Sequence, residues 1–131
     1  MKLTPSPAAL AALSMVALAS TSSLASDAPP GNVSRGAEAF QKVCSACHTI
    51  EQGARRRVGP NLFGVLGSRI AQKEGYPYTE AFRRSDIVWN EATLTDFLAS
   101  PGSVVPGTKM DWTVKDEQVI ADLIAFIRDY R

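Results

Sequence analysis

The stretch Cys44-Ser45-Ala46-Cys47-His48 contains both cysteines and the only histidine of the 131-residue chain. On a helix, positions 44 and 47 lie one turn apart, so both thiols project to one side and the imidazole follows directly. Cys-x-x-Cys-His is the attachment signature of c-type haem. Each thiol can bond a porphyrin vinyl group, and His48 can ligate the iron. The spacing therefore predicts one haem c, covalently attached through Cys44 and Cys47.

Three other uses of this motif compete with haem attachment. A thioredoxin-like redox pair also uses Cys-x-x-Cys, but it needs a strand–helix–strand context, and no such pattern surrounds the motif. A structural zinc site needs four ligands, so two cysteines and one histidine would need a carboxylate to complete it. A plain disulfide is possible in an exported chain, because the number of cysteines is even. The absence of any other Cys or His in the sequence favours haem.

Residues 1–26 are organised like a secretory signal peptide. Lys2 precedes an apolar stretch over residues 8–19, and a small-x-small site, Ser23-Leu24-Ala25, follows it. The apolar stretch is too short to cross a membrane, which takes about 20 residues. An uncleaved anchor or an Ala-rich tail is the alternative, whereas the lack of arginine before Arg35 disfavours a mitochondrial transit peptide. We therefore expect export to the periplasm.

The rest of the chain is expected to form one domain. A flexible lead-in over residues 27–33 precedes a domain over residues 34–131, which is too short for two sizeable cores. The formal net charge of +1 argues against nucleic-acid binding driven by bulk positive charge. No transmembrane segment is expected in the mature chain.

Hydrophobic periodicity predicts an all-α fold with three main helices, short helical turns and long loops. Ser34 and Asn90 are the expected caps of the first two helices. The expected segments are a helix over 34–47, a turn over 79–84, a helix from Asn90 to Ala99, and a last helix from a loose capping box at 113–116 to about Tyr130. Residues 49–78 contain five glycines and two prolines, and residues 101–112 form another loop. Such a large share of loop residues in a small domain favours a bound cofactor around which the loops are ordered.

Met110 is the only methionine beyond residue 26. The iron of haem is usually bound by His, Met, Cys or Tyr, and both cysteines and His48 already have roles. Elimination therefore makes Met110, on a Pro- and Gly-containing loop, the second axial ligand. A lone methionine is more often core filler, but its loop position and the lack of competing ligands favour ligation. The predicted metal ligands are His48 and Met110.

Several motifs follow one another along the chain in this order: Gly36-Ala37-Glu38-Ala39-Phe40, Cys44-x-x-Cys47-His48, Gly59-Pro60-Asn61-Leu62-Phe63-Gly64, Tyr76-x-Tyr78-Thr79, Trp89, Pro106-Gly107-Thr108-Lys109-Met110 and Leu123-Ile124-Ala125-Phe126. In this order and spacing they resemble class I cytochrome c, of the mitochondrial and related bacterial type. The resemblance covers residues 36–131. It implies an all-α fold wrapped around one haem, in which Gly36 and Phe40 of the first helix cross Leu123 and Phe126 of the last.

The resemblance also implies roles for residues around the haem. Pro60 is expected to offer its carbonyl to His48 and so fix the imidazole. Tyr78 and Trp89 are expected to hydrogen-bond a buried haem propionate, with Thr108 as a nearby support. Core packing of Tyr78 and Trp89 is compatible with this role, because a buried Trp N–H or Tyr O–H still needs a partner.

Three positions depart from the family pattern. Phe97 stands where relatives have a tyrosine that contacts the Met sulfur, and Phe82 where they have an asparagine near an internal water. Ser68 stands where an arginine usually supports a propionate, and whether the neighbouring Arg69 compensates is left open by the sequence. These changes leave the ligand set intact but alter the internal polar network.

The resemblance implies a soluble, exported, monohaem electron carrier rather than an enzyme. Single electrons would pass between redox enzymes by Fe(III)/Fe(II) cycling of a haem ligated by His48 and Met110. The alternative is a haem subunit dedicated to one periplasmic dehydrogenase complex, so the chain would be a monomer or part of a heterodimer. A peroxidase-like function would need an open iron position.

Charge is distributed unevenly along the chain. Residues 35–84 carry a formal charge of +5 and residues 85–131 carry −4. Arg55-Arg56-Arg57 follows the haem motif, and in relatives this region borders the exposed haem edge. We therefore expect redox partners with acidic docking surfaces, although a solvated loop would explain the same charges.

Overall fold

The computed structural model describes residues 1–4 and 28–131. The apolar stretch and small-residue site of the expected signal peptide lie outside the described residues, as does residue 27 of the lead-in. Within the part that is described, no helix is long and apolar enough to cross a membrane.

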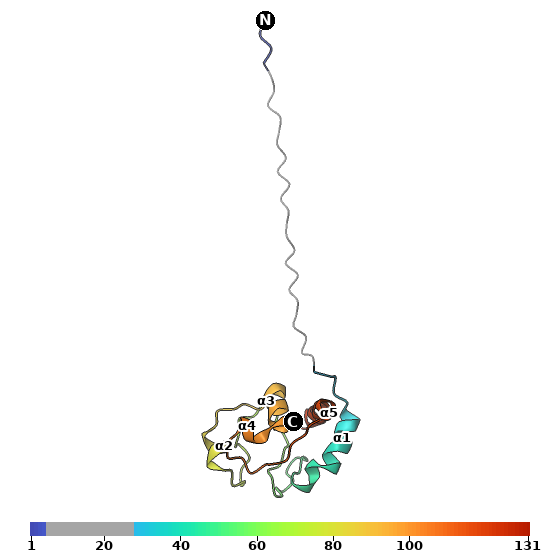
Figure 1. Ribbon diagram of the computed structural model, residues 1–131, viewed down its shortest axis with the longest axis vertical. Helices are drawn as coiled ribbons and strands as arrows, with labels where there is room; N and C mark the ends of the chain where they lie inside the picture. The colour runs from blue at the N-terminus through green and yellow to red at the C-terminus, as the bar shows by residue number, and fades with distance from the viewer. Residues whose placement is uncertain (5–27) are drawn as a thin grey trace.

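Helices and loops make up the domain, which confirms the all-α prediction. Residues 28–131 contain no strand, only one isolated bridge between Arg69 and Val88. The helical segments are α1 (Val33–Lys42), the 3-10 turn η1 (Cys44–Ala46), α2 (Glu80–Arg84), α3 (Glu91–Ala99), α4 (Pro101–Val104) and α5 (Glu117–Ile127). Figure 1 shows α1 and α5 together on one side of the domain and α2 at the opposite side.

The first helix differs from its prediction at both ends. It begins at Val33 because the Asn32 side chain, not that of Ser34, accepts the Arg35 N–H, at 2.9 Å. It ends at Lys42, and the first cysteine opens a separate 3-10 turn. The haem motif therefore lies on a tighter turn than the continuous helix predicted over 34–47.

The second half of the chain matches the predictions in part. Asn90 caps α3, as expected, through a reciprocal box with Thr93. The turn predicted over 79–84 is the short helix α2, which Thr79 caps. Pro101 begins the short helix α4 where a loop was expected, since proline is tolerated at the first helical position. The last helix is capped by Asp116 rather than by a box from residue 113, and it ends at Ile127 rather than near Tyr130.

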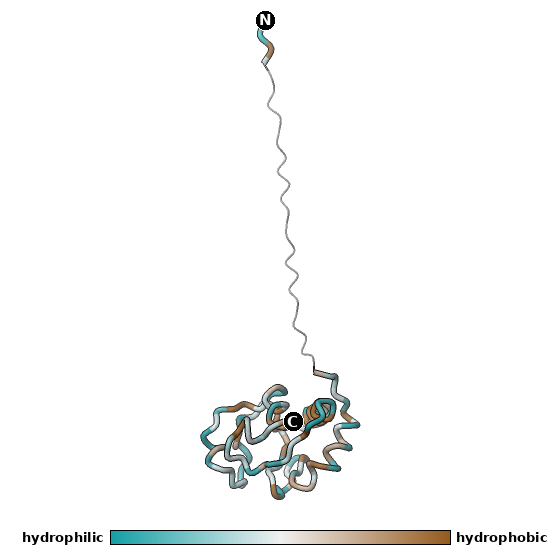
Figure 2. The backbone as a smooth tube through the Cα atoms, in the orientation of Figure 1, coloured by the Kyte–Doolittle hydropathy of each residue, from teal (hydrophilic) through white to brown (hydrophobic). Residues whose placement is uncertain are grey.

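The first and last helices cross at a glycine, as the resemblance implied. A Cβ added to Gly36 would lie 1.9 Å from the Asp122 carbonyl oxygen, so only glycine permits this approach. Phe40 and Phe126 pack with ring centroids 5.4 Å apart, and Leu123 beside them is 1% exposed. Figure 2 shows the apolar residues concentrated along α5. This crossing is the centre of the apolar core.

Asp122 joins the two helices to the chain that precedes them. Arg35 Nε and Nη2 donate to its two oxygens at 2.7 and 2.9 Å, and the Asn32 N–H donates at 2.7 Å. The Gln118 amide donates to Asp122 at 3.0 Å and to the Pro30 carbonyl at 2.9 Å. These hydrogen bonds, above all those from Arg35, lower the pKa of Asp122 to about 2. Residues 30–33 of the predicted lead-in are thereby held against α5.

Candidate functional site

The η1 turn brings the two thiols and the imidazole together. The N–H groups of Cys47 and His48 both donate to the Cys44 carbonyl, at 3.1 and 2.9 Å. Cys44 is half-buried, Cys47 is exposed, and both thiols are free. Burial, with a smaller contribution from Cys47, raises the pKa of Cys44 to about 11. The residues that the structure describes hold no cluster of three or more His, Cys, Asp or Glu side chains that could bind a metal ion.

His48 is held by a backbone carbonyl and by a glycine. Its Nδ1 lies 2.8 Å from the Pro60 carbonyl oxygen, which can only accept, so Nδ1 carries the proton and Nε2 keeps its lone pair. Burial lowers the pKa of His48, partly opposed by this hydrogen bond, so the ring is neutral at physiological pH. A Cβ on Gly59 would lie 2.3 Å from His48 Cε1. The sequence contained Gly59 in a motif, but only the folded chain shows that it makes room for the ring.

Tyr78 and Trp89 lie at the two ends of one run of aromatic rings. Tyr78 stacks on Phe82 with centroids 5.7 Å apart, Phe82 meets Phe97 at 5.9 Å, and Phe97 meets Trp89 at 5.0 Å. Trp89 is 6% exposed, and the Tyr78 hydroxyl accepts the Lys73 N–H at 3.3 Å. The two departures from the family pattern, Phe82 and Phe97, therefore contact each other and replace polar side chains with an apolar wall.

The loop that carries Met110 is tied to the segment before Tyr78. Thr108 Oγ1 accepts the Met110 N–H at 3.1 Å, and Lys109 Nζ donates to the Pro77 carbonyl at 3.2 Å. Met110 itself is half-buried and packs against the apolar core. The contact between Lys109 and Pro77 therefore places the segment of Thr108 and Met110 beside the segment of Tyr78.

Ser68 and Arg69 do not restore the arginine that the family pattern has at this point. The Ser68 hydroxyl donates to the Val65 carbonyl at 2.7 Å. Arg69 Nη2 lies 2.6 Å from Asp86 Oδ1, in an exposed ion pair. Arg69 is therefore engaged at the surface and does not compensate for Ser68.

The donor set fits a haem c. Two free thiols on one turn can form the two thioether bonds, and a neutral imidazole beside them presents Nε2 to a metal while Nδ1 is fixed by a carbonyl. Gly59 keeps the space around that ring clear. A helical domain with these features defines a protein that carries a covalently bound haem.

Comparison with known proteins identifies the family. The cytochrome c family model matches residues 33–130. The chain is 40% identical to cytochrome c of Sesamum indicum and 39% identical to that of Ulva intestinalis, each over 104 residues that cover 79% of this chain and 94% of the relative. It is 38% identical to cytochrome c of Gibberella zeae over 100 residues, 76% of this chain and 94% of the relative. The chain therefore belongs to the cytochrome c family. It is a haem-containing electron carrier, not an enzyme, and it binds haem c through Cys44 and Cys47.

Proposed function

We propose that the chain carries single electrons in the periplasm with His48 and Met110 as the axial ligands of its haem iron. The hydrogen bond of 2.8 Å between His48 Nδ1 and the Pro60 carbonyl is the observation that carries this proposal. It leaves Nε2 as the nitrogen available to the metal and fixes the ring in one orientation. The haem supplies one-electron redox chemistry when it is bound.

The chain's own residues set the conditions for electron transfer. Met110 would supply a soft thioether ligand to the iron, which would favour the reduced state. Thr108 and Lys109 hold the Met110 loop in place through their contacts at 3.1 and 3.2 Å. With His48 and Met110 both held to the iron, the chain would leave no position for a substrate, and electrons would pass by outer-sphere transfer. Tyr78 and Trp89, with Thr108 as support, are the proposed partners of a haem propionate.

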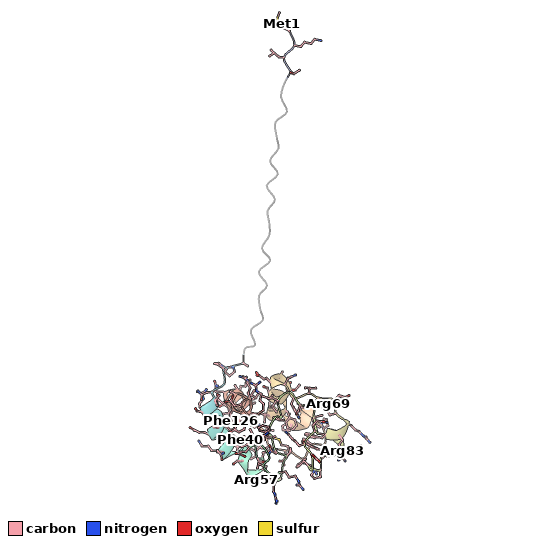
Figure 3. The ribbon with its side chains drawn as sticks, turned by 180° about the vertical axis from the view of Figure 1, so that it is seen from behind. Met1, Phe40, Arg57, Arg69, Arg83 and Phe126 are labelled. Atoms are coloured by element: carbon pink, nitrogen blue, oxygen red, sulfur yellow. The ribbon has the colours of Figure 1, made fainter. Side chains whose placement is uncertain are left out.

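The loop Arg55–Arg57 is the proposed docking region for acidic redox partners. Arg57 Nη1 donates to the Ser45 carbonyl at 2.5 Å, so this positive loop lies directly against the turn that bears the cysteines. Figure 3 shows Arg57 at the lower edge of the domain, below Phe40, whereas Arg69 and Arg83 lie on the side away from Phe40 and Phe126. Only Arg57 of these three contacts the haem-attachment turn, which favours docking beside that turn.

Absorption spectra test the ligand set. The oxidised protein should show the weak far-red charge-transfer band of a thioether–Fe(III) bond, and Met110→Ala should abolish it while the pyridine haemochrome stays c-type. Met110→His is the matched control, since it keeps two strong ligands and should lack the same band. A band that survives in Met110→Ala would exclude Met110 as the ligand.

Fractionation and purification test the location and the mode of action. Recovery of the haem protein from the periplasm, without residues 1–26, supports export. A monomer that exchanges electrons with more than one partner supports a free carrier. Stable co-purification with one oxidoreductase, through an interface of about 2,000 Å² or more, would instead support the dedicated subunit.

A further inference from the structure

The direction of the Pro60 carbonyl is set by the peptide unit that Pro60 shares with Asn61. A peptide unit is rigid and planar, so its oxygen changes direction only when the whole plane between these two residues turns. This oxygen is the one that lies 2.8 Å from His48 Nδ1. Whatever fixes Asn61 therefore also fixes the acceptor that orients the imidazole.

The side-chain amide of Asn61 uses both of its N–H donors and its oxygen. Nδ2 donates to the Glu51 carbonyl at 2.9 Å and to the Ala54 carbonyl at 2.8 Å. Oδ1 accepts the Phe63 N–H at 2.7 Å. A carbonyl can only accept and a backbone N–H can only donate, so these partners fix which end of the amide is which. The side chain therefore has a single orientation, set by three backbone groups.

These bonds connect a turn earlier in the chain to the segment that carries the Pro60 carbonyl. Residues 51–54 form this turn, which is closed by the Ala54 N–H on the Glu51 carbonyl at 3.1 Å. Asn61 binds the carbonyls at both ends of the turn. The turn thus serves as a fixed support against which the peptide of Pro60 is held.

Two backbone hydrogen bonds hold the same segment on either side of that peptide. The Gly59 N–H donates to the Cys47 carbonyl at 2.7 Å, and the Leu62 N–H donates to the Thr49 carbonyl at 2.8 Å. They fix the residues before and after, but the peptide between residues 60 and 61 can still tilt about its flanking single bonds. The side-chain amide described above resists this tilt.

We propose that Asn61 is a positioning residue for the axial imidazole, which tunes electron donation by His48 through the Pro60 carbonyl. A firm hydrogen bond from Nδ1 to a carbonyl makes an imidazole more basic, so Nε2 donates more strongly to a metal. Stronger donation favours Fe(III) over Fe(II), so Asn61 lowers the reduction potential. This inference rests on the proposed ligation by His48 and adds a residue that acts from one peptide away.

The reduction potential of the haem protein and the solvent exchange of the His48 Nδ1 proton test this role. In Asn61→Ala the reduction equilibrium should shift about threefold toward Fe(II), or about 28 mV at about 59 mV per tenfold. Exchange of the Nδ1 proton, followed by NMR, should accelerate about tenfold, because the carbonyl that protects it is no longer held in place. The far-red thioether band should persist, since Met110 is unchanged.

Asn32→Ala is the matched control. Asn32 is also an asparagine whose side chain holds the backbone, but it does so at the start of α1, where it accepts the Arg35 N–H at 2.9 Å. This variant should unfold more easily without a change in the potential or in the Nδ1 exchange rate. A merely structural Asn61 would behave in the same way. Easier unfolding of Asn61→Ala with an unchanged potential and exchange rate would therefore overturn the proposal.

Asn61→Ser is a milder variant that tests the proposal even if the alanine variant does not fold. A serine hydroxyl can still accept the Phe63 N–H, but it has one donor where the amide has two. Nδ1 exchange should accelerate about threefold, less than in the alanine variant.

The wild-type exchange rate separates failure of this inference from failure of the proposed ligand set. Slow exchange in the wild type that stays equally slow in both Asn61 variants would overturn the role of Asn61 and leave ligation by His48 standing. Free exchange of the Nδ1 proton in the wild type would overturn the proposed geometry of His48, and the role of Asn61 with it.

Discussion

The crossing of α1 and α5 and the loop segment 49–78 are stabilised in different ways. At the crossing, Phe40 and Phe126 bury large side chains around Asp122 and its hydrogen bonds. The loop segment contributes only Ile50 and Ile70 to the buried apolar core and is held by individual hydrogen bonds. The crossing thus provides most of the stability of the fold, while the loops position the side chains of the haem site. The same kind of substitution should therefore have different effects in the two regions.

The largest effect should come from a methyl group at the helix crossing. In Gly36→Ala the new Cβ would lie 1.9 Å from a backbone oxygen, which cannot move without separating the helices. We expect a loss of about 3 kcal/mol or more in the free energy of unfolding. Denaturant unfolding followed by far-UV circular dichroism measures it. Gly102→Ala is the matched control, since nothing lies within 4 Å of its added Cβ, and it should be neutral or slightly stabilising.

The same change at Gly59 should alter the site more than the fold. The added Cβ would lie 2.3 Å from His48 Cε1, so the ring must shift away from the Pro60 carbonyl. We expect a stability loss of about 2 kcal/mol and a changed haem spectrum. Gly102→Ala again serves as the control, because its Cβ meets nothing within 4 Å and its φ lies outside the left-handed region. An unaltered spectrum in Gly59→Ala would contradict the role of this glycine in placing the imidazole.

Asp122→Asn should weaken the crossing in a pH-dependent way. The amide keeps the shape but loses the charged bonds to Arg35, at a cost of about 1.5 kcal/mol at neutral pH after allowance for the half-exposed guanidinium. Because the folded pKa of Asp122 is lowered to about 2, its contribution is complete above the ordinary pKa and is lost as the pH falls through the folded value. Unfolding curves of both proteins should converge between about pH 4 and pH 2. A constant difference across that range would show that the ion pair is not its source.

The smallest effect is expected in the loop segment, at Ala71. Its φ of 62° lies in the left-handed region, which costs a residue with a Cβ about 1 kcal/mol. Ala71→Gly removes that cost and adds entropy to the unfolded chain, so we expect a net stabilisation of about 0.5 kcal/mol. Gly67→Ala, at φ 89° with open space around its Cβ, is the reciprocal test and should destabilise by about 1 kcal/mol. Thermal unfolding of both variants measures whether each substitution raises or lowers the stability of the fold.

The sequence predicted those features that depend on local spacing. Cys44, Cys47 and His48 could be recognised because covalent attachment requires that order, and Asn90 could be recognised because a cap acts within one turn. The fixed spacing of family motifs also indicated the helix crossing. The cap and the last residue of α1 were predicted less accurately. Asn32 competes with Ser34 for the cap position, and the Asn32 N–H is held by Asp122, which is distant in the chain.

The remaining features depend on contacts between residues far apart in the chain. Asp122 lies about ninety positions from Asn32 and Arg35, and a single acid on an otherwise apolar helix face gives no local signal of its partners. Likewise, Phe82 and Phe97 were expected to change the polar network, but only the folded chain shows that they pack against each other. The hydrogen bonds from Asn61 to the turn at 51–54 also join two segments whose proximity no spacing rule predicts.

The pairing of α1 with α5 also sets an order of events for a newly made chain. These helices stand at the two ends of the domain, so their shared core cannot form until the final residues have been synthesised. The chain between the two helices must first close into a long loop, which costs conformational entropy. That cost is offset only when Phe40 and Phe126 are in contact. During that interval the cysteines, which follow α1 directly, are exposed on an unfolded chain. The topology therefore leaves the cysteines accessible to a cofactor until the two terminal helices have paired.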